Sequence, residues 1–271
     1  LGGLGAQLEV ASIDHGLRPE SVAEVAQVGR RARELGLPFH ALELQLASGP
    51  NLQARAREAR RGVLLALGAD RIATAHHEDD QAETVLQHLL RGGGMSGLRG
   101  MRAHAGAWVR PLLREPRAVL QAWAELRGLR WFEDPTNEGS QRGRLRDLMP
   151  SLDGIHGGAS GALARSARLL AREDALVAEL ADGAWSRVCR DGGSAVDRSE
   201  WVALHPALKM RVLRRLVSPV GPLVRADQLE ALLLGTLQTG AVFTLPGGWG
   251  LAVADDRLVL VAREPGDLPG P

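Results

Sequence analysis

The densest group of reactive side chains lies between residues 76 and 84. Here two histidines, His76 and His77, are followed by the carboxylates of Asp79, Asp80 and Glu83. Residues three or four positions apart share one face of a helix, so these carboxylates would lie close together. Like charges at that spacing repel one another unless a cation lies between them. Three kinds of cation fit this place: a metal ion, the ammonium group of a substrate, or an arginine of the protein.

Helix capping is the alternative explanation for the acidic residues. Carboxylates in the first turn of a helix accept hydrogen bonds from free backbone N–H groups and oppose the helix dipole. One acid is enough for a cap, so capping leaves His76, His77 and Glu83 without a role. We therefore interpret the segment as a binding or catalytic site.

Further groups could bind ions elsewhere in the first half of the chain. Asp14 and His15 follow the first apolar run, where a buried structural histidine is the alternative. Arg57 and Arg60 are three residues apart in a helical pattern, which suits them to hold an anion, although a solvated helix face has the same pattern. Three glycines at 92–94 resemble a phosphate-binding loop, and a helix end explains them equally well.

The elements that position these groups alternate between strand and helix. Short apolar runs and amphipathic segments follow one another over the first half of the chain, which is typical of an α/β fold with a parallel, doubly wound sheet. In such sheets ligands bind at the carboxyl ends of the strands, where both histidine clusters fall. We expect strands at 8–14, 39–46, 71–75 and 108–113, and helices at 20–35, 51–67, 79–90 and 116–127.

The pattern changes at residues 150–161, which are rich in glycine and small side chains. Before this boundary we expect an ordered polar loop at 133–146. The predicted domains are a catalytic domain at 1–152, a linker helix at 153–190 and a small α+β domain at 191–271. Beyond the boundary we expect helices at 162–190, 204–217 and 225–235, and strands at 242–245, 250–254 and 258–261.

The composition excludes several classes of protein. The 271 residues include 33 Lys plus Arg and 32 Asp plus Glu, so we do not expect a polybasic arm or an acidic tail to be the main means of binding. Cys189 is the only cysteine, which excludes an intrachain disulfide and a cysteine-rich metal site and favours a reducing, cytoplasmic setting. No apolar run reaches the roughly 20 residues of a membrane helix and no export signal is recognisable, so we expect no membrane partner.

Six sequence blocks occur in order along the chain: Asp14 to Ser21, Ala56 to Arg60, Ala75 to Thr84, Leu90 to Gly92, Arg110 to Leu113 and Glu133 to Asn137. Together they closely resemble the tRNA(Ile)-lysidine synthetases. The resemblance extends from Leu8 to about Leu152 and continues more weakly to Leu260. It implies an N-type ATP pyrophosphatase fold, which belongs to the adenine nucleotide alpha hydrolase-like class, followed by a linker helix. It also implies that the small C-terminal domain at 191–271 recognises the tRNA or another substrate.

The resemblance also implies a reaction. ATP would adenylate the C2 oxygen of the wobble cytidine in an isoleucine tRNA with a CAU anticodon, and the lysine ε-amine would then displace AMP. The product, lysidine, changes decoding from AUG to AUA. ATP and Mg²⁺ would be the cofactors, and tRNA(Ile) and L-lysine the partners. The oligomeric state stays open, with a homodimer as one option.

The matching positions suggest three groups of site residues. The catalytic group is Asp79, Asp80, Glu83 and His76. Its three acids would contact lysine or a metal, and Asp79 and Asp80 are the candidate Mg²⁺ ligands. The group expected to bind ATP or another substrate is Asp14, His15, Arg57 and Arg60. The arginines expected on the tRNA backbone are Arg18, Arg91, Arg110, Arg142, Arg144 and Arg146.

The chain departs from the family pattern at its start and at two other positions. The phosphate-binding loop Ser-Gly-Gly-x-Asp-Ser is not found, so we expect either an upstream segment outside this sequence or a protein that does not activate ATP normally. Arg61 stands where an aromatic residue is usual, and Gly143 where asparagine is usual. Two alternative functions stay open. A chain without the phosphate loop would be a non-catalytic tRNA-binding protein. A metal-dependent phosphoesterase is the other, because the two histidine clusters contain side chains that bind Mn²⁺ or Mg²⁺, namely Asp14, His15, His76, His77, Asp79 and Asp80.

Overall fold

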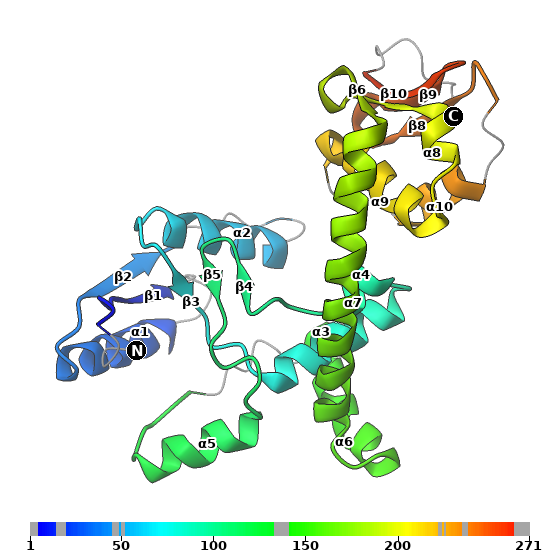
Figure 1. The fold of residues 1–271 in the computed structure, drawn as a ribbon. Coiled ribbons are helices and arrows are strands. Elements are labelled where there is room, and N and C mark those ends of the chain that lie inside the picture. The colour runs from blue at the N-terminus through cyan, green and yellow to red at the C-terminus, as the bar shows by residue number, and fades with distance from the viewer. Residues whose placement is uncertain are drawn as a thin grey trace. The chain divides into compact units, whose positions relative to one another are not determined.

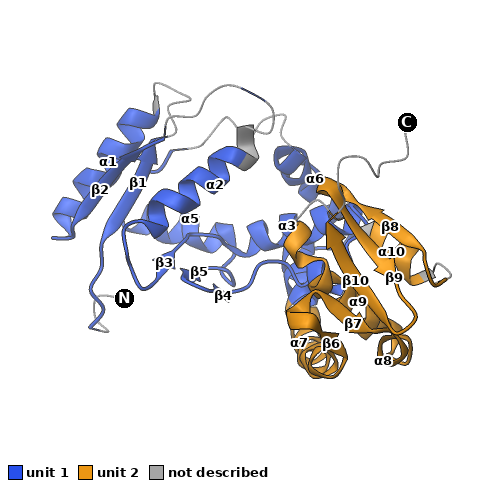
Figure 2. Cartoon of the chain, turned by 90° about the horizontal axis from the view of Figure 1, so that it is seen from above, with its two compact units in different colours: residues 1–167 blue, residues 168–271 orange. Residues whose placement is uncertain are grey.

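The chain divides into two compact units, residues 1–167 and residues 168–271 (Figure 2). A computed structural model describes residues 5–14, 20–44, 49, 52–132, 141–221, 224, 226–234 and 238–262. Among the described helices, none combines the length and apolarity that crossing a membrane requires. The domain boundaries at 152 and 190 stay predictions.

The first unit begins with a strand–helix–strand crossover. β1 (Val10–Asp14) pairs in parallel with β2 (Phe39–Glu43), with Val10 opposite Phe39. The connecting helix α1 (Glu20–Glu34) packs along both strands (Figure 1). A Cβ atom at Gly29 of α1 would lie 2.7 Å from the Phe39 ring, so glycine lets the helix approach the sheet. This crossover is the unit that the alternating pattern predicted.

A second sheet in the same unit carries the candidate site. β3 (Ile72–Ala73) pairs in parallel with β5 (Trp108–Val109), which also forms an antiparallel hairpin with β4 (His104–Ala105). Parallel pairs in both sheets agree with the predicted α/β class, although the described residues place β1 and β3 in separate sheets. The helices of this unit are α2 (Leu52–Leu65), α3 (Glu78–Leu90), α4 (Met95–Leu98), α5 (Arg117–Leu126) and α6 (Gln141–Ile155).

Helix α6 corrects two expectations. Residues 141–146 are helical rather than part of a polar loop, and α6 continues through Pro150 into the predicted boundary segment. Proline removes one helical hydrogen bond, but Leu145 and Met149 are buried in a cluster with Ala82, which holds α6 against α3. Packing therefore outweighs the local preference of the sequence. Residues 133–140 lie outside the described part of the chain.

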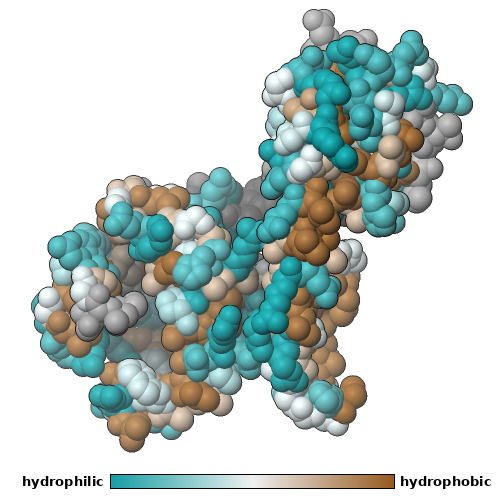
Figure 3. Space-filling model, viewed as in Figure 1, coloured by the Kyte–Doolittle hydropathy of each residue, from teal (hydrophilic) through white to brown (hydrophobic). Residues whose placement is uncertain are grey.

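The long helix α7 (Ala159–Val188) is labelled in Figure 1. It includes residue 167, where the first unit ends, and residue 168, where the second begins. Three of its leucines, Leu169, Leu176 and Leu180, are more than half exposed, and hydrophobic side chains reach the surface of the molecule in several places (Figure 3). The apolar spacing along this segment thus predicted a helix correctly without showing how far its residues would be buried.

The second unit contains an antiparallel sheet in the order β6-β7-β10-β9-β8. Its core includes Val188, Val196, Leu213, Leu216 and Leu258, all essentially buried. The sequence missed β6, β7 and α8 because segments this short have too little periodicity to detect. The elements are β6 (Cys189–Arg190), η3 (Asp191–Gly193), β7 (Ala195–Asp197), α8 (Arg198–Val202), α9 (Pro206–Leu216), η4 (Ser218–Val220), α10 (Ala226–Leu234), β8 (Val242–Leu245), η5 (Pro246–Gly248), β9 (Trp249–Val253) and β10 (Arg257–Ala262).

Candidate functional site

A reciprocal cap starts α3. His77 is the N-cap residue, and its Nδ1 accepts a hydrogen bond from the backbone N–H of Asp80 at 3.3 Å. In return, Asp80 Oδ2 accepts one from the backbone N–H of His77 at 3.0 Å. The pair forms a capping box with histidine in place of the usual serine or threonine. Capping is therefore one role of Asp80 and His77.

Asp79 has a different partner from the other two acids. Its Oδ2 accepts a hydrogen bond at 2.8 Å from the backbone N–H of Arg117, the first residue of α5. Such N–H groups at a helix start have no partner within their own helix. The expectation that three carboxylates form one group thus holds for Asp80 and Glu83 but not for Asp79.

Two arginines of α6 neutralise Asp80 and Glu83. Arg142 donates from Nε to Glu83 Oε2 at 2.6 Å and from Nη2 to Asp80 Oδ1 at 2.7 Å. Arg146 donates from Nε to Glu83 Oε1 at 2.9 Å. Burial opposes the charge of Arg146, but its hydrogen bond and ion pair with Glu83 raise its pKa above the usual value. Of the three cations that the sequence allowed, the structure supplies the arginine of the protein.

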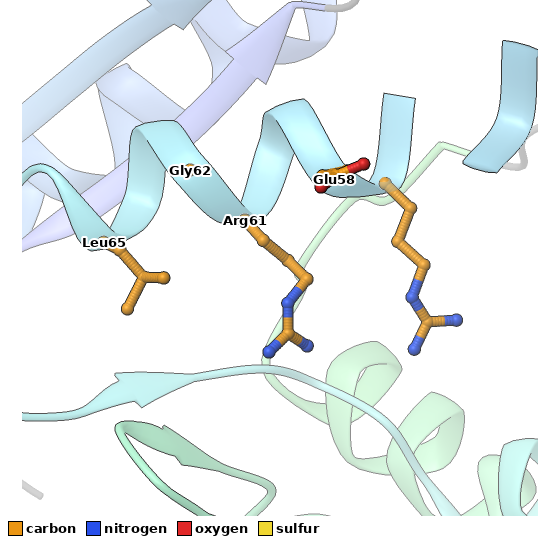
Figure 4. A pocket seen from close by; sticks show the side chains of 5 residues that line it. Glu58, Arg61, Gly62 and Leu65 are labelled. Carbon is orange, nitrogen blue, oxygen red and sulfur yellow. The ribbon is translucent and has the colours of Figure 1, made fainter. Parts of the chain in front are cut away.

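A cavity of about 1490 Å³ lies in the first unit, beside this cluster. Its wall includes parts of β1, α2 and β3, and His76 from the segment before α3. Among its described lining residues, six arginines face only two acids, Glu9 and Asp70. A smaller open hollow of about 490 Å³ lies along α2, where Arg61 projects beside Gly62 (Figure 4). The six arginines are Arg57, Arg60, Arg61, Arg71, Arg110 and Arg142.

Several of these positive charges have no carboxylate partner among the residues that the structure describes. In the described part of the chain, Arg57, Arg60 and Arg61 form no ion pair with a carboxylate. Burial lowers the pKa of Arg60, and the charges of Arg57, Arg142 and Arg61 lower it further. Burial likewise lowers the pKa of Arg110, and the charges of Arg57 and Arg61 lower it further. An anion in the cavity would relieve this repulsion.

Arg110 contains one further polar group that could serve a ligand. Its Nη1 donates to the backbone carbonyl of Arg102 at 2.7 Å, whereas its buried Nε has no hydrogen-bond partner among the described residues. A buried donor of this kind costs free energy unless something accepts its hydrogen bond. The arrangement therefore fits a bound anion.

Burial favours the neutral form of His76, which lies at the cavity wall. Its Nδ1 lies 2.9 Å from Thr74 Oγ1. Burial lowers the pKa of His76; Asp80 opposes this shift, while Arg110, Arg142 and Arg60 reinforce it. A neutral imidazole can accept a proton from a substrate.

The other predicted site residues are dispersed. Asp14 ends β1 and accepts a hydrogen bond from Ser21 of α1. Arg91 donates to the side chain of Gln141, and Arg144 is exposed on α6. Arg110 and Arg142 line the cavity, and Arg146 pairs with Glu83. His15, Arg18 and the block Glu133 to Asn137 lie outside the described residues.

The glycines at 92–94 belong to the end of α3. Gly92 has a φ of +69° and the N–H of Gly93 donates to the carbonyl of His88 at 2.7 Å, an arrangement typical of a helix stop. Of the two explanations that the sequence left open, the structure supports the helix end.

Sequence reasoning missed the roles of Arg61 and Gln81. Arg61 was noted only as a departure, yet its guanidinium stacks over the Trp108 ring at 4.6 Å from the centroid; its spacing of four residues from Arg57 was the available signal. The buried side chain of Gln81 bonds both backbone groups of Met101, with Oε1 accepting at 2.8 Å and Nε2 donating at 3.1 Å. No local pattern in the sequence could have indicated this contact between Gln81 and Met101.

The described residues do not fit a metal site built from protein ligands alone. They bring together no group of three or more His, Cys, Asp or Glu side chains placed to hold a metal ion. Both oxygens of Asp80 and one oxygen of Asp79 already accept hydrogen bonds from the protein. Mg²⁺ commonly binds through one or two carboxylates together with substrate phosphates, so these residues could at most complete the coordination of a nucleotide-bound ion.

Comparison with known proteins identifies the family. The model of the PP-loop domain family matches residues 4–152. The tRNA(Ile)-lysidine synthase of Novosphingobium aromaticivorans is 39% identical over 254 residues, which cover 88% of this chain and 76% of that protein. The corresponding enzyme of Methylobacterium nodulans is 40% identical over 250 residues, which cover 84% of this chain and 73% of the relative.

Two further matches extend this comparison. The tRNA(Ile)-lysidine synthase of Thermus thermophilus is 38% identical over 256 residues, which cover 90% of this chain but only 50% of that longer protein. A solved U34-tRNA thiolase from Methanococcus maripaludis matches 59% of this chain and 62% of its own, with 19% identity and a TM-score of 0.48. The family match and the curated relatives show that the chain belongs to the PP-loop family and, within it, to the tRNA(Ile)-lysidine synthases.

Proposed function

We propose that this protein uses ATP to join L-lysine to C2 of the wobble cytidine in a CAU-anticodon isoleucine tRNA. The observation that carries the proposal is the arginine-lined cavity within a PP-loop domain. The three curated relatives from Novosphingobium aromaticivorans, Methylobacterium nodulans and Thermus thermophilus support it, because each is a tRNA(Ile)-lysidine synthase. The metal-dependent phosphoesterase alternative has no support from these relatives.

The first step would transfer AMP to the base. The C2 oxygen of the cytidine attacks the α-phosphorus of ATP, a P–O bond forms, and the bond to the bridging oxygen breaks to release pyrophosphate. Negative charge collects on the phosphates in this step, so positive groups fixed beforehand lower its barrier. Arg57, Arg60 and Arg110 suit this task because none of them forms an ion pair with a carboxylate of the described residues. Mg²⁺ would neutralise the same phosphates when it enters with ATP.

The second step would form lysidine. The ε-ammonium group of lysine must first lose a proton, and the neutral imidazole of His76 is our candidate to accept it. The amine then attacks C2, the C2–O bond breaks, and AMP leaves with the oxygen. A further proton is lost from the nitrogen as the product forms. A wobble base in a single-stranded loop can turn out of its stack into such a cavity.

The tRNA backbone needs contacts outside the cavity. Arg144 is exposed on α6 and stays our candidate for a phosphate contact. Arg91 and Arg146 are less suited because each already binds a side chain of the protein. We assign residues 191–271 to recognition of the tRNA or another substrate, as the family resemblance implies.

Incorporation of radiolabelled lysine tests the proposal. The natural full-length protein should attach lysine to a CAU transcript of tRNA(Ile), dependent on ATP, and should leave a GAU transcript unmodified. Arg60→Gln should lower the rate, whereas Arg172→Ala, a change at an exposed arginine of α7, should not. No incorporation by the natural protein, with tRNA binding intact, would instead indicate the non-catalytic tRNA-binding alternative.

A further inference from the structure

Arg142 differs from the other arginines of the cavity in how it is held. Two carboxylates of α3 bind one guanidinium that comes from α6, through Nε and Nη2. Nη1 of Arg142 has no hydrogen bond to a described residue. Among the described lining residues, Arg142 is the only arginine paired with a carboxylate. Its orientation is therefore fixed while one end of its fork stays available.

The carboxylate of Glu83 is not accessible to a substrate. Its side chain is only 2% exposed, and each of its oxygens already accepts a hydrogen bond from an arginine. Asp80 is similarly committed, with one oxygen on Arg142 and the other on the backbone of His77. A lysine ammonium could reach Glu83 only by displacing these donors. This geometry argues against the expected direct contact between these acids and lysine.

We propose that Asp80 and Glu83 are positioning residues that hold the Arg142 guanidinium at the cavity, where its free Nη1 contacts the phosphate transferred from ATP. The proposal rests on the function proposed above and assigns roles within that same site. Arg142 would act on the adenylation step and not on lysine binding.

The fork geometry of arginine is central to this role. Two anchoring bonds fix the plane of the guanidinium before the substrate arrives, so little freedom is lost when Nη1 binds phosphate. The two acids and the two arginines compensate each other, so Arg142 contributes an oriented donor more than an excess of charge. Lysine at this position would keep the charge but could not span Glu83 and the phosphate at once.

The test measures tRNA-dependent pyrophosphate release by the natural full-length protein. Arg142→Ala should lower kcat about 100-fold, the scale for losing one transition-state donor, with KM for lysine changed by less than about twofold. Arg142→Lys should be impaired nearly as much. Millimolar guanidinium should restore activity to Arg142→Ala about tenfold, but not to the double variant Arg142→Ala/Glu83→Gln, because the added cation needs the same anchor. Arg172→Ala serves as the surface control.

Several results would overturn the proposal. Full activity of Arg142→Lys would show that charge alone matters. A Glu83→Gln variant that raised KM for lysine without changing kcat would show direct lysine contact. Rescue of activity by guanidinium in the double variant would show that Glu83 does not position the guanidinium of Arg142. Should Glu83→Gln fail to fold by circular dichroism, Arg142→Lys and the guanidinium rescue still decide the matter. If the natural protein makes no lysidine, the proposed function fails; if it is active and Arg142→Ala is unaffected, only this inference fails.

Discussion

Replacing Glu83 with glutamine probes the buried ion-pair cluster between α3 and α6. The Glu83 carboxylate accepts hydrogen bonds from Arg142 at 2.6 Å and from Arg146 at 2.9 Å. Glutamine keeps the size and one acceptor oxygen but removes the negative charge. Its amide group also places a donor opposite one of the two guanidiniums. The variant therefore isolates the charge of Glu83 from its volume.

The structure sets the size of the effect. A hydrogen bond to a charged group contributes about 1.5 to 3 kcal/mol to folding. Here the arginine side chains are 40% and 39% exposed, so each can turn to water when its partner is lost. The cost should therefore fall below the roughly 3 to 5 kcal/mol of a fully buried broken pair. We expect Glu83→Gln to lower the free energy of unfolding by about 2 kcal/mol.

Urea unfolding followed by circular dichroism measures this loss. The unfolding midpoint should fall while the denaturant slope stays constant, which indicates that stability alone has changed. Glu34→Gln is the matched control, because Arg31 and Glu34 pair at 2.8 Å while their side chains are 52% and 60% exposed. That change should cost less than about 0.5 kcal/mol. Equal losses in the two variants would refute the claim that burial makes the Glu83 cluster important.

Three more predictions follow from the site. Burial and nearby arginines lower the pKa of His76 below 6.5, so near and below that pH the unfolded chain binds more protons than the folded one. The free energy of unfolding should therefore decrease on acidification. Thermal melts between about pH 7 and about pH 5 should show a smaller decrease for His76→Gln than for the natural protein. Arg60→Gln removes the repulsion between Arg60 and the neighbouring arginines, so it should not lower the free energy of unfolding. The same variant should bind ATP about tenfold more weakly in calorimetry. An unchanged affinity for ATP would contradict the proposed anion site. Gly100→Ala combines a φ of +64° with a Cβ atom 2.7 Å from the Gln81 side chain, and should lower the free energy of unfolding by about 2 kcal/mol in urea. The control Gly106→Ala has a φ of +61° but no atom within 4 Å of its Cβ, and should cost about 1 kcal/mol. Equal losses in the two variants would show that the steric contact with Gln81 does not contribute.

The sequence by itself determined most helices and strands of the first unit and indicated residues 76–84 as the candidate site. Alternating apolar and amphipathic segments predicted these elements, because hydrophobic periodicity depends only on neighbouring residues. The cluster at 76–84 was recognisable for the same reason, since a capping box and a set of acids at helical spacing are local patterns. The ordered blocks identified the family before any geometry was known.

The tertiary structure alone decided which partner each charged group has. Arg142 and Glu83 are 59 residues apart in the chain, and Arg146 and Glu83 are 63 apart. No local spacing specifies such pairs, so the sequence allowed a metal, a substrate or an arginine as the cation, and the family resemblance favoured lysine or a metal. Packing of Leu145 and Met149 against α3 turns the expected loop at 141–146 into a helix and brings its arginines to the acids. Burial then makes the pairing selective, because a carboxylate removed from water needs a counter-charge that only the fold can place beside it.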